Sequence, residues 1–182
     1  MSALTSVGRV LQKTTAFLLC DVQETMKSEI FQYASVIATA QKMKDSGSTD
    51  SELDLTQAKL NTTKTKFSMY VPKVAKELKG MKTVVLFGIE AHVCILQTAM
   101  DLLENNFDVL ILVDGVSSTN GFEIKHALNH IKSAGGFLTT SESVLFQLIC
   151  DANHDKFKSI SDLVKKTREA TAGNKLVSYG DL

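Results

Sequence analysis

A cysteine and an aspartate of this chain each follow a predicted strand, and the ends of neighbouring strands would bring the two side chains together. Cys94 follows the apolar run 83–89 by five residues, at the predicted start of a helix, and Asp21 closes another apolar run. The free N–H groups of a helix N-terminus favour a thiolate and can also hold an oxyanion. With Asp21 as a base and a lysine as a cation, Cys94 would be a hydrolytic nucleophile. A cysteine in the first turn of a helix is more often a small apolar packing residue, so that second interpretation stays open.

The elements that must position these residues alternate along the chain. Apolar runs predict buried strands at 15–22, 83–89, 109–114 and 137–140. Apolar spacing, caps and breakers predict helices at 28–43, 70–78, 93–104, 124–133, 141–151 and 157–168. This alternation predicts an α/β fold in three layers, α/β/α, around a mostly parallel, Rossmann-like sheet. Ligands of such sheets bind beyond the carboxyl ends of the strands, which selects Asp21, residues 90–94 and Asp114 as candidates.

The composition is that of a globular protein without a strong electrostatic bias. The 182 residues include 20 basic and 20 acidic side chains, so the formal net charge is zero. This balance argues against a protein built to bind nucleic acid, and no apolar run reaches the roughly 18 residues of a membrane span. We therefore expect a single domain over residues 1–182 that acts on a small molecule.

The three cysteines, Cys20, Cys94 and Cys150, contain no pair at metal-ligand spacing. Their odd number argues against a disulfide framework and for a reducing compartment. We expect the cytoplasm, with a mitochondrial association as the alternative. Cys20 and Cys150 are predicted to be buried apolar fillers. We expect no metal ion and no other cofactor.

Three segments of the chain resemble the core motifs of the isochorismatase-like cysteine hydrolases, and more narrowly those of the eukaryotic isochorismatase domain-containing proteins. They are FLLCDVQ around Asp21, KTKFSM from Lys64, and GIEAHVCILQTAMDLL around Cys94. The similarity continues through VDGVSS and TTSESVLFQL and covers most of residues 14–166. The resemblance implies the fold of that superfamily.

The resemblance also implies a catalytic triad of Asp21, Lys64 and Cys94. Lys64 takes the lysine position rather than Lys66, because the family pattern is Lys-x-x-aromatic-Ser and Phe67 fixes the register. In the implied mechanism, Asp21 takes the thiol proton and Lys64 stabilises the thiolate, which then attacks a carbonyl carbon.

Further implied features lie just before the cysteine. A cis peptide bond is expected between Ile89 and Glu90, and the amides of Glu90 and Cys94 would form an oxyanion hole. Asp114 could support the site or only cap the following loop, and His92 is more simply explained as a partly exposed residue at the helix start. The residues that could support the triad are Gln23, Phe67, His92 and Asp114.

The function that the resemblance implies is hydrolysis of a small amide or ester. True isochorismatases cleave a vinyl ether without this cysteine, so the family name does not name the reaction. Two alternatives stay open. One is a catalytically idle or orphan member that acts as an interaction module, and the other is a ribonuclease, as some relatives have been labelled. The resemblance also implies a homo-oligomer.

One stretch departs from the family pattern. Relatives carry a further helical portion, a buried strand and a loop over the site before the lysine, but residues 44–63 are polar here and hold no apolar run for a strand. An internal omission of about 15 to 20 residues between 43 and 64 explains this difference. The absent strand would lie beside the strand that ends at Asp21, so its loss would expose an apolar edge. Either the chain is a shortened variant of doubtful activity or, as we favour, the sequence leaves out a stretch of the natural protein.

Overall fold

A parallel sheet of four strands, in the order β1-β2-β3-β4, forms the centre of the part that the structure describes. The computed structural model describes residues 7–22, 26–45 and 58–180. The strands are β1 (Thr15–Cys20), β2 (Thr83–Ile89), β3 (Asp108–Ser117) and β4 (Phe137–Thr139). β2 is buried along its whole length and β3 along nearly all of it, as expected for apolar strands covered on both faces.

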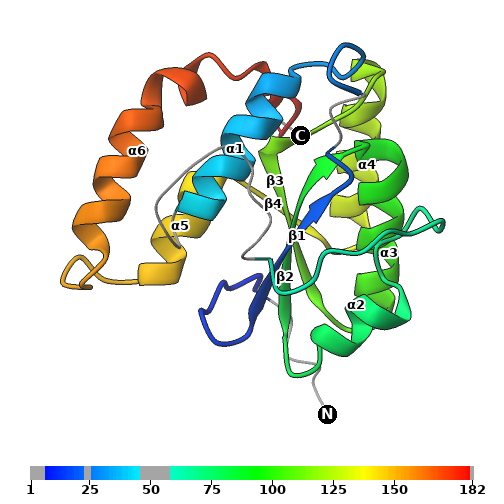
Figure 1. The fold of residues 1–182 in the computed structure, drawn as a ribbon, viewed down its shortest axis with the longest axis horizontal. Helices are drawn as coiled ribbons and strands as arrows, with labels where there is room; N and C mark the ends of the chain where they lie inside the picture. Colours follow the sequence, from blue (N-terminus) through cyan, green and yellow to red (C-terminus); the bar gives the residue numbers. More distant parts are fainter. Residues whose placement is uncertain (1–6, 23–25, 46–57, 181–182) are drawn as a thin grey trace.

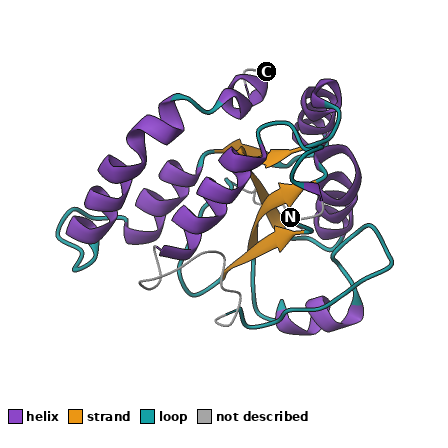
Figure 2. Cartoon of the chain, turned by 45° about the horizontal axis from the view of Figure 1, so that its top comes forward, coloured by secondary structure: helices purple, strands orange, loops and turns teal. Residues whose placement is uncertain are grey.

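Helices cover both faces of the sheet, which confirms the predicted three-layer α/β/α fold (Figure 1, Figure 2). One face carries α1 (Tyr33–Asp45), α5 (Ser141–Ile149) and α6 (Phe157–Ala172). The other carries α2 (Pro72–Glu77), α3 (Leu96–Glu104) and α4 (Gly121–Ser133). A π-helical turn, η3 (Ala91–Ile95), precedes α3, and a 3₁₀ segment, η4 (Lys175–Gly180), follows α6. No helix among the described residues is both long and apolar enough to span a bilayer.

The side chains of β2 alternate between two core clusters, because successive residues of a strand point to opposite faces. Val84 and Leu86 belong to the cluster that contains Ile95 of η3 and residues of α3 and α4. Val85 and Phe87 belong to the cluster that contains residues of α5 and α6. The central strand therefore holds both helical layers to one sheet.

The structure corrects the predicted start of the first helix. Residues 28–32 form turns, and α1 begins only at Tyr33. The amide of Phe31 donates to the carbonyl of Ser118 (3.1 Å), and Gln32 has a φ of 52°. A residue with positive φ cannot continue a right-handed helix, so α1 starts after it.

The predicted helix 93–104 and strand 109–114 are also corrected. The helix begins earlier, with the π-helical turn η3, and becomes regular only at Leu96. The strand runs on to Ser117, because after a shift in register Val116 and Ser117 pair with the end of β2. Asp114 therefore lies inside β3 and not at its end.

Other predicted elements differ mainly at their ends. The first strand stops at Cys20, since Asp21 leaves the extended region with a φ of 42°. The fourth helix starts at Gly121 because the Asn120 side chain caps it by accepting from Phe122 N (3.1 Å). The remaining helices and β4 differ from their predicted bounds by one to four residues, and η4 was not predicted.

β1 lies at the edge of the described sheet. It pairs with β2 on one side, and no described strand pairs with it on the other. Phe17, in the middle of β1, is 38% exposed. Residues 58–71 contain no strand, and the rest of the stretch where the sequence suggests an omission, 46–57, lies outside the described residues.

Candidate active site

Three side chains from separate segments meet beyond the carboxyl end of β1. Asp21 directly follows β1, Lys64 comes from the segment before α2, and Cys94 lies in η3. The Lys64 Nζ atom lies 2.5 Å from Asp21 Oδ2 and 3.6 Å from Cys94 Sγ. The Lys64 side chain is 11% exposed and Cys94 is 9% exposed. A nearly buried ammonium group thus bridges a carboxylate and a thiol.

Close packing of two backbones brings β1 to the end of β2. Cys20 and Gly88 are neighbours across the two strands. Gly88 has a φ of 116°, and a Cβ atom there would lie 2.2 Å from the carbonyl oxygen of Cys20. Only glycine satisfies both conditions, so Gly88 allows Cys20 and Asp21 to approach the segment that leads to Cys94.

The segment that carries Lys64 is fastened to the helix after Cys94. Met69 N donates to Thr98 Oγ1 (2.8 Å), and Thr98 Oγ1 donates to the carbonyl of Cys94 (2.6 Å). Lys66 pairs with Asp101 on α3 (2.7 Å), and its side chain is 56% exposed. The structure therefore places Lys64, and not Lys66, next to the thiol.

The pKa of Cys94 is lowered to about 7. The first cause is a hydrogen bond from the Cys20 thiol, and the charge of Lys64 adds to it, while burial and the Asp21 carboxylate act in the opposite direction. The same hydrogen bond to Cys94, together with burial and the charge of Asp21, raises the pKa of Cys20. Near neutral pH, Cys94 is therefore a thiolate in a substantial fraction of molecules, while Cys20 stays a thiol.

The pKa of Lys64 is raised above its ordinary value. Burial alone would lower it, but the hydrogen bond to Asp21 and the negative charges of the Cys94 thiolate and of Asp21 outweigh burial. Lys64 therefore stays positively charged while Cys94 loses its proton.

The turn before Cys94 has the predicted backbone. The peptide bond between Ile89 and Glu90 is cis. The carbonyl of Glu90 accepts from the amides of Val93 (3.2 Å) and Ile95 (3.0 Å), which flank Cys94 in the chain. The turn is thus closed around the residue that bears the thiol.

Ser118, which directly follows β3, steadies this turn, and Ser117 at the end of β3 holds Phe31 in the segment before α1; neither serine is among the predicted site residues. Ser118 Oγ accepts from Ala91 N (3.0 Å) and contacts His92 Nδ1 (3.0 Å), and Ser117 Oγ donates to the carbonyl of Phe31. The VDGVSS motif contains both serines, so it was the available signal.

The other predicted supporting residues have different surroundings. His92 is partly exposed and lies 3.4 Å from Glu90 Oε2, and Phe67 is 57% exposed. The Asp114 carboxylate accepts from Ser141 N (2.9 Å) and Ser141 Oγ (2.5 Å). Asp114 therefore fixes the start of α5, and no hydrogen bond joins it to the triad among the described residues. Gln23 lies outside the described residues.

The structure separates the two cysteines that were predicted to be buried. Cys20 is fully buried, as predicted. The prediction is wrong for Cys150, which is exposed. The reason is that Cys150 ends α5 with a φ of 58°, where its thiol donates to the carbonyl of Gln147 (2.8 Å). Cys20 is more than an apolar filler, because its sulfur lies within 4.8 Å of Cys94 Sγ, and its place directly before Asp21 in the sequence was the available signal.

The donor atoms at the site could be considered for a metal ion. Cys20 Sγ, a carboxylate oxygen of Asp21 and Cys94 Sγ lie within 4.8 Å of one another. The Lys64 ammonium group already contacts two of the three donors, and its raised pKa keeps it charged. A metal ion would have to displace this ammonium group, because two positive charges repel each other at this distance. The three donor atoms therefore fit an ion pair with Lys64 better than they fit a metal site.

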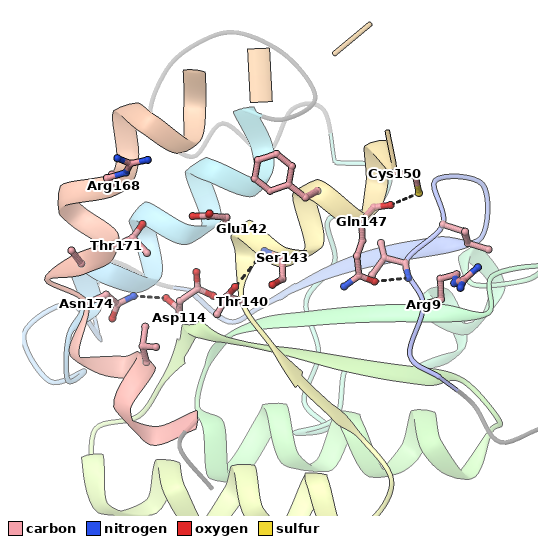
Figure 3. Close-up of a pocket in the computed structure, with 15 residues that line it drawn as sticks. Arg9, Asp114, Thr140, Glu142, Ser143, Gln147, Cys150, Arg168, Thr171 and Asn174 are labelled. Carbon is pink, nitrogen blue, oxygen red and sulfur yellow. Dashed lines mark hydrogen bonds between the residues drawn. The ribbon is translucent and has the colours of Figure 1, made fainter. Parts of the chain in front are cut away.

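A large cavity lies elsewhere, between the N-terminal segment, α5 and α6 (Figure 3). Its volume is about 1010 Å³. Arg9, Glu142 and Arg168 are among its polar lining residues, and Asp114 reaches its wall. None of the triad residues lines this cavity, so size alone does not identify the reactive site.

The family follows from comparison with known proteins. The isochorismatase domain model matches residues 46–143, more than half of the chain. Isochorismatase domain-containing protein 1 of Danio rerio is 39% identical over 183 aligned positions, which cover 89% of this chain and 65% of that protein. The chain belongs to the isochorismatase family. The alignment has 183 positions, but 89% of the 182 residues of this family member is only about 162 residues. About 20 positions of the relative therefore have no counterpart in this family member.

Solved structures give this isochorismatase family member two informative neighbours. MAR1 ribonuclease from Caenorhabditis elegans is 33% identical with a TM-score of 0.77, and the match covers 86% of this chain and 92% of that one. The YcaC gene product of Escherichia coli, an octameric hydrolase of unknown specificity, has a TM-score of 0.75 at 18% identity, with 94% and 96% of the chains covered. The second likeness shows the fold alone. The match to the isochorismatase family, and not this likeness of fold, supports membership in a hydrolase superfamily.

Proposed function

We propose that the protein is a cysteine hydrolase that cleaves a small amide or ester. The observation that carries the proposal is the position of Lys64 Nζ, 2.5 Å from the Asp21 carboxylate and 3.6 Å from Cys94 Sγ. A nucleophilic thiol needs a proton acceptor and a positive charge at contact distance, and this arrangement supplies both. The pKa of Cys94, lowered to about 7, supports the same role.

In the first step, Cys94 passes its proton to Asp21, and the ammonium group of Lys64 stabilises the thiolate. The sulfur attacks the carbonyl carbon of the substrate, and the amides of Glu90 and Cys94 bind the oxyanion that forms. Asp21 then protonates the leaving amine or alcohol, and the bond to the leaving group breaks. Water, activated by Asp21, cleaves the thioester and returns Cys94 to its starting state.

We propose a small substrate, a homo-oligomeric assembly and a cytoplasmic location. The low exposure of Lys64 and Cys94 suits a compact substrate, and the zero net charge argues against a polyanion. The octameric YcaC neighbour supports self-association, as does the edge of β1, with which no strand among the described residues pairs. All three cysteines are free, which suits a reducing compartment.

The neighbour named MAR1 ribonuclease makes RNA a second candidate substrate. If this site cleaved RNA, the protein would need a basic surface that binds the phosphate backbone. The formal net charge of zero gives no overall attraction to phosphate. RNA therefore belongs in the substrate test as the competing outcome.

The test is a substrate screen with purified protein and variants of the triad. The panel contains small amides, ureides and esters, together with single-stranded RNA. We expect hydrolysis of at least one small carbonyl compound by the wild type, and its loss in Cys94→Ala, Asp21→Asn and Lys64→Met. Cys150→Ser is the matched cysteine control and keeps full activity.

Three results would overturn the proposal. Full activity of Cys94→Ala on a substrate that the wild type hydrolyses would exclude the thiol as nucleophile. Cleavage of RNA that survives in Cys94→Ala, with no turnover of any carbonyl compound, would favour the ribonuclease. If nothing is turned over and Cys94 is alkylated no faster than Cys20, the chain is an idle member that acts as an interaction module.

A further inference from the structure

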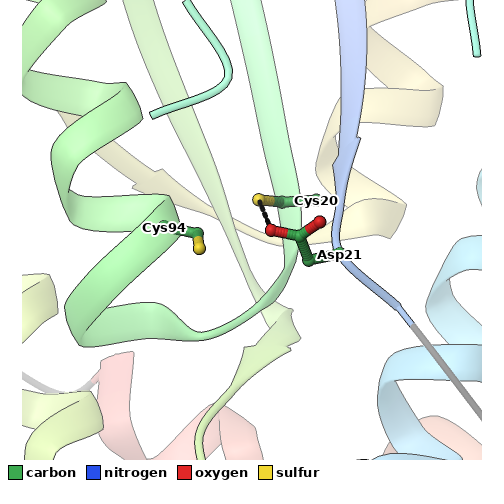
Figure 4. Close-up of side chains that lie close together, drawn as sticks. All are labelled: Cys20, Asp21 and Cys94. Atoms are coloured by element: carbon green, nitrogen blue, oxygen red, sulfur yellow. Dashed lines mark hydrogen bonds between the residues drawn. The ribbon is translucent and has the colours of Figure 1, made fainter. Parts of the chain in front are cut away.

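A second thiol lies beside the proposed nucleophile. Cys20 Sγ and Cys94 Sγ lie within 4.8 Å of each other, and a carboxylate oxygen of Asp21 lies within the same distance of both. Figure 4 shows the Cys20 sulfur on the side of its strand that faces the turn carrying Cys94. The hydrolytic mechanism proposed above forms no bond to Cys20. The position of Cys20 next to Cys94 therefore suggests a chemical role other than hydrolysis.

We propose that Cys94 and Cys20 form a reversible disulfide after a small hydroperoxide has oxidised Cys94, and that this bond switches the hydrolase off. The inference rests on the Cys94 thiolate of the proposed function. In this inference Cys20 is the resolving cysteine, which attacks the oxidised sulfur of Cys94.

The first step is oxidation of Cys94. Its thiolate sulfur attacks one oxygen of the hydroperoxide, an S–O bond forms, the O–O bond breaks, and hydroxide or an alkoxide leaves. The sulfur loses two electrons and the peroxide gains them, so the product is a sulfenic acid. Lys64, 3.6 Å from Sγ, keeps the thiolate populated for this attack.

The second step joins the two sulfurs. The thiol of Cys20 passes its proton to Asp21, whose Oδ2 lies 3.9 Å from Cys20 Sγ. The Cys20 sulfur attacks the sulfenic sulfur, the S–S bond forms and the S–O bond breaks. The departing hydroxide takes the proton from Asp21 and leaves as water, so the net change is the loss of one water molecule.

The surroundings decide which thiol plays which part. Cys20 has no exposed surface, so a dissolved peroxide does not reach it directly, whereas Cys94 is 9% exposed and bears the reactive thiolate. While Cys94 is a thiolate, its charge and hydrogen bond keep Cys20 protonated. Oxidation removes that charge and that hydrogen bond, so the pKa of Cys20 falls, while burial and the Asp21 carboxylate still act to raise it. Cys150 is exposed and belongs to the end of α5, so it serves as a control.

The experiment treats the full-length reduced protein with hydrogen peroxide at neutral pH and follows the intact mass. We expect a loss of about 2 Da, reversed by a thiol reductant, and a non-reduced peptide map that joins the Cys20 and Cys94 peptides. Hydrolytic activity falls in proportion to the disulfide and returns on reduction. The wild-type map needs no variant, so the test does not depend on the folding of a mutant.

Two variants sharpen the test. In Cys20→Ser the sulfenic acid of Cys94 has no partner. With a 1,3-dione present it is captured as the dione adduct; without the dione a second hydroperoxide oxidises it to the sulfinic acid, a gain of about 32 Da in total that a thiol reductant does not reverse. Cys150→Ser forms the Cys20–Cys94 bond as the wild type does. Matching thermal melts show that both variants are folded.

The possible results separate this inference from the proposed function. Sulfinic acid on Cys94 with Cys20 still reduced in the wild type, or a disulfide between two chains, refutes the resolving role and leaves the hydrolase untouched. A Cys20–Cys94 disulfide in a protein whose hydrolysis survives Cys94→Ala refutes the hydrolytic mechanism and leaves the redox site standing.

Discussion

The substitution Lys64→Met tests the electrostatic basis of the site most directly. It removes a positive charge that lies 3.6 Å from Cys94 Sγ and keeps a side chain of similar length. At an effective dielectric constant of about 20 to 40, a unit charge 3.6 Å away contributes roughly 2 to 5 kcal/mol, or about 2 to 3 pKa units. The substitution removes a cation, so the pKa of Cys94 rises from about 7.

The expected effect on reactivity is smaller than the effect on the thiolate population. At pH 7 the thiolate fraction falls from about one half to roughly 1% or less. A thiolate of higher pKa is intrinsically more nucleophilic, which recovers roughly 8-fold for a shift of 2 units and roughly 25-fold for a shift of 3 units. Alkylation of Cys94 at pH 7 should therefore slow by about 5- to 25-fold.

The assay follows alkylation of Cys94 by iodoacetamide between pH 5 and 10, with peptide mass spectrometry to identify the site. The midpoint of the wild-type profile reports the pKa of the thiol, and that of Lys64→Met should move to higher pH. Lys66→Met is the matched control, because Lys66 pairs with Asp101 at the surface and not with the thiol. A midpoint that Lys64→Met leaves within about half a unit of the wild type would refute the reasoning.

Three further predictions follow from individual contacts. Cys20→Ala removes the thiol that is the first cause of the lowered pKa of Cys94, so the midpoint of Cys94 alkylation should rise by at least as much as in Lys64→Met, measured as above. Gly88→Ala should lower the free energy of unfolding by about 2 to 4 kcal/mol in denaturant titrations, because its Cβ would meet a carbonyl oxygen. Gly135→Ala, with a φ of 100° but open space, should cost only about 1 to 2 kcal/mol, and equal losses would contradict the steric argument. The natural protein should have a mass about 2 kDa above 19.9 kDa, with extra peptides within 43–64, whereas a mass of 19.9 kDa would show that nothing is omitted.

The sequence was sufficient for the elements whose signals are local. β2 was predicted with its observed bounds, because the short, mostly apolar run TVVLFGI between Lys82 and Glu90 has one simple explanation in an alternating α/β chain. The motifs also selected Asp21, Lys64 and Cys94, and the structure brings these three side chains into contact. The alternation of strands and helices was enough for the three-layer fold.

Only the tertiary structure decided what each side chain near the site touches. Asp114 looked like a residue at the end of a strand, but β3 continues past it and its carboxylate binds Ser141. Cys20 and Cys150 looked alike, yet one lies against Cys94 and the other is exposed at a helix end. Burial, charge and hydrogen bonding depend on neighbours that are distant in the chain.

The reactivity of Cys94 is the clearest case. Its residue type and its place before a helix are written in the sequence, but its pKa depends on a thiol from β1 and an ammonium group from the segment before α2. Those groups are 74 and 30 positions away in the chain, and the sheet brings them within a few ångströms. The sequence therefore determined which residues make up the proposed site, and the fold decided in which direction their pKa values shift, because electrostatic effects follow distance in space and not distance along the chain.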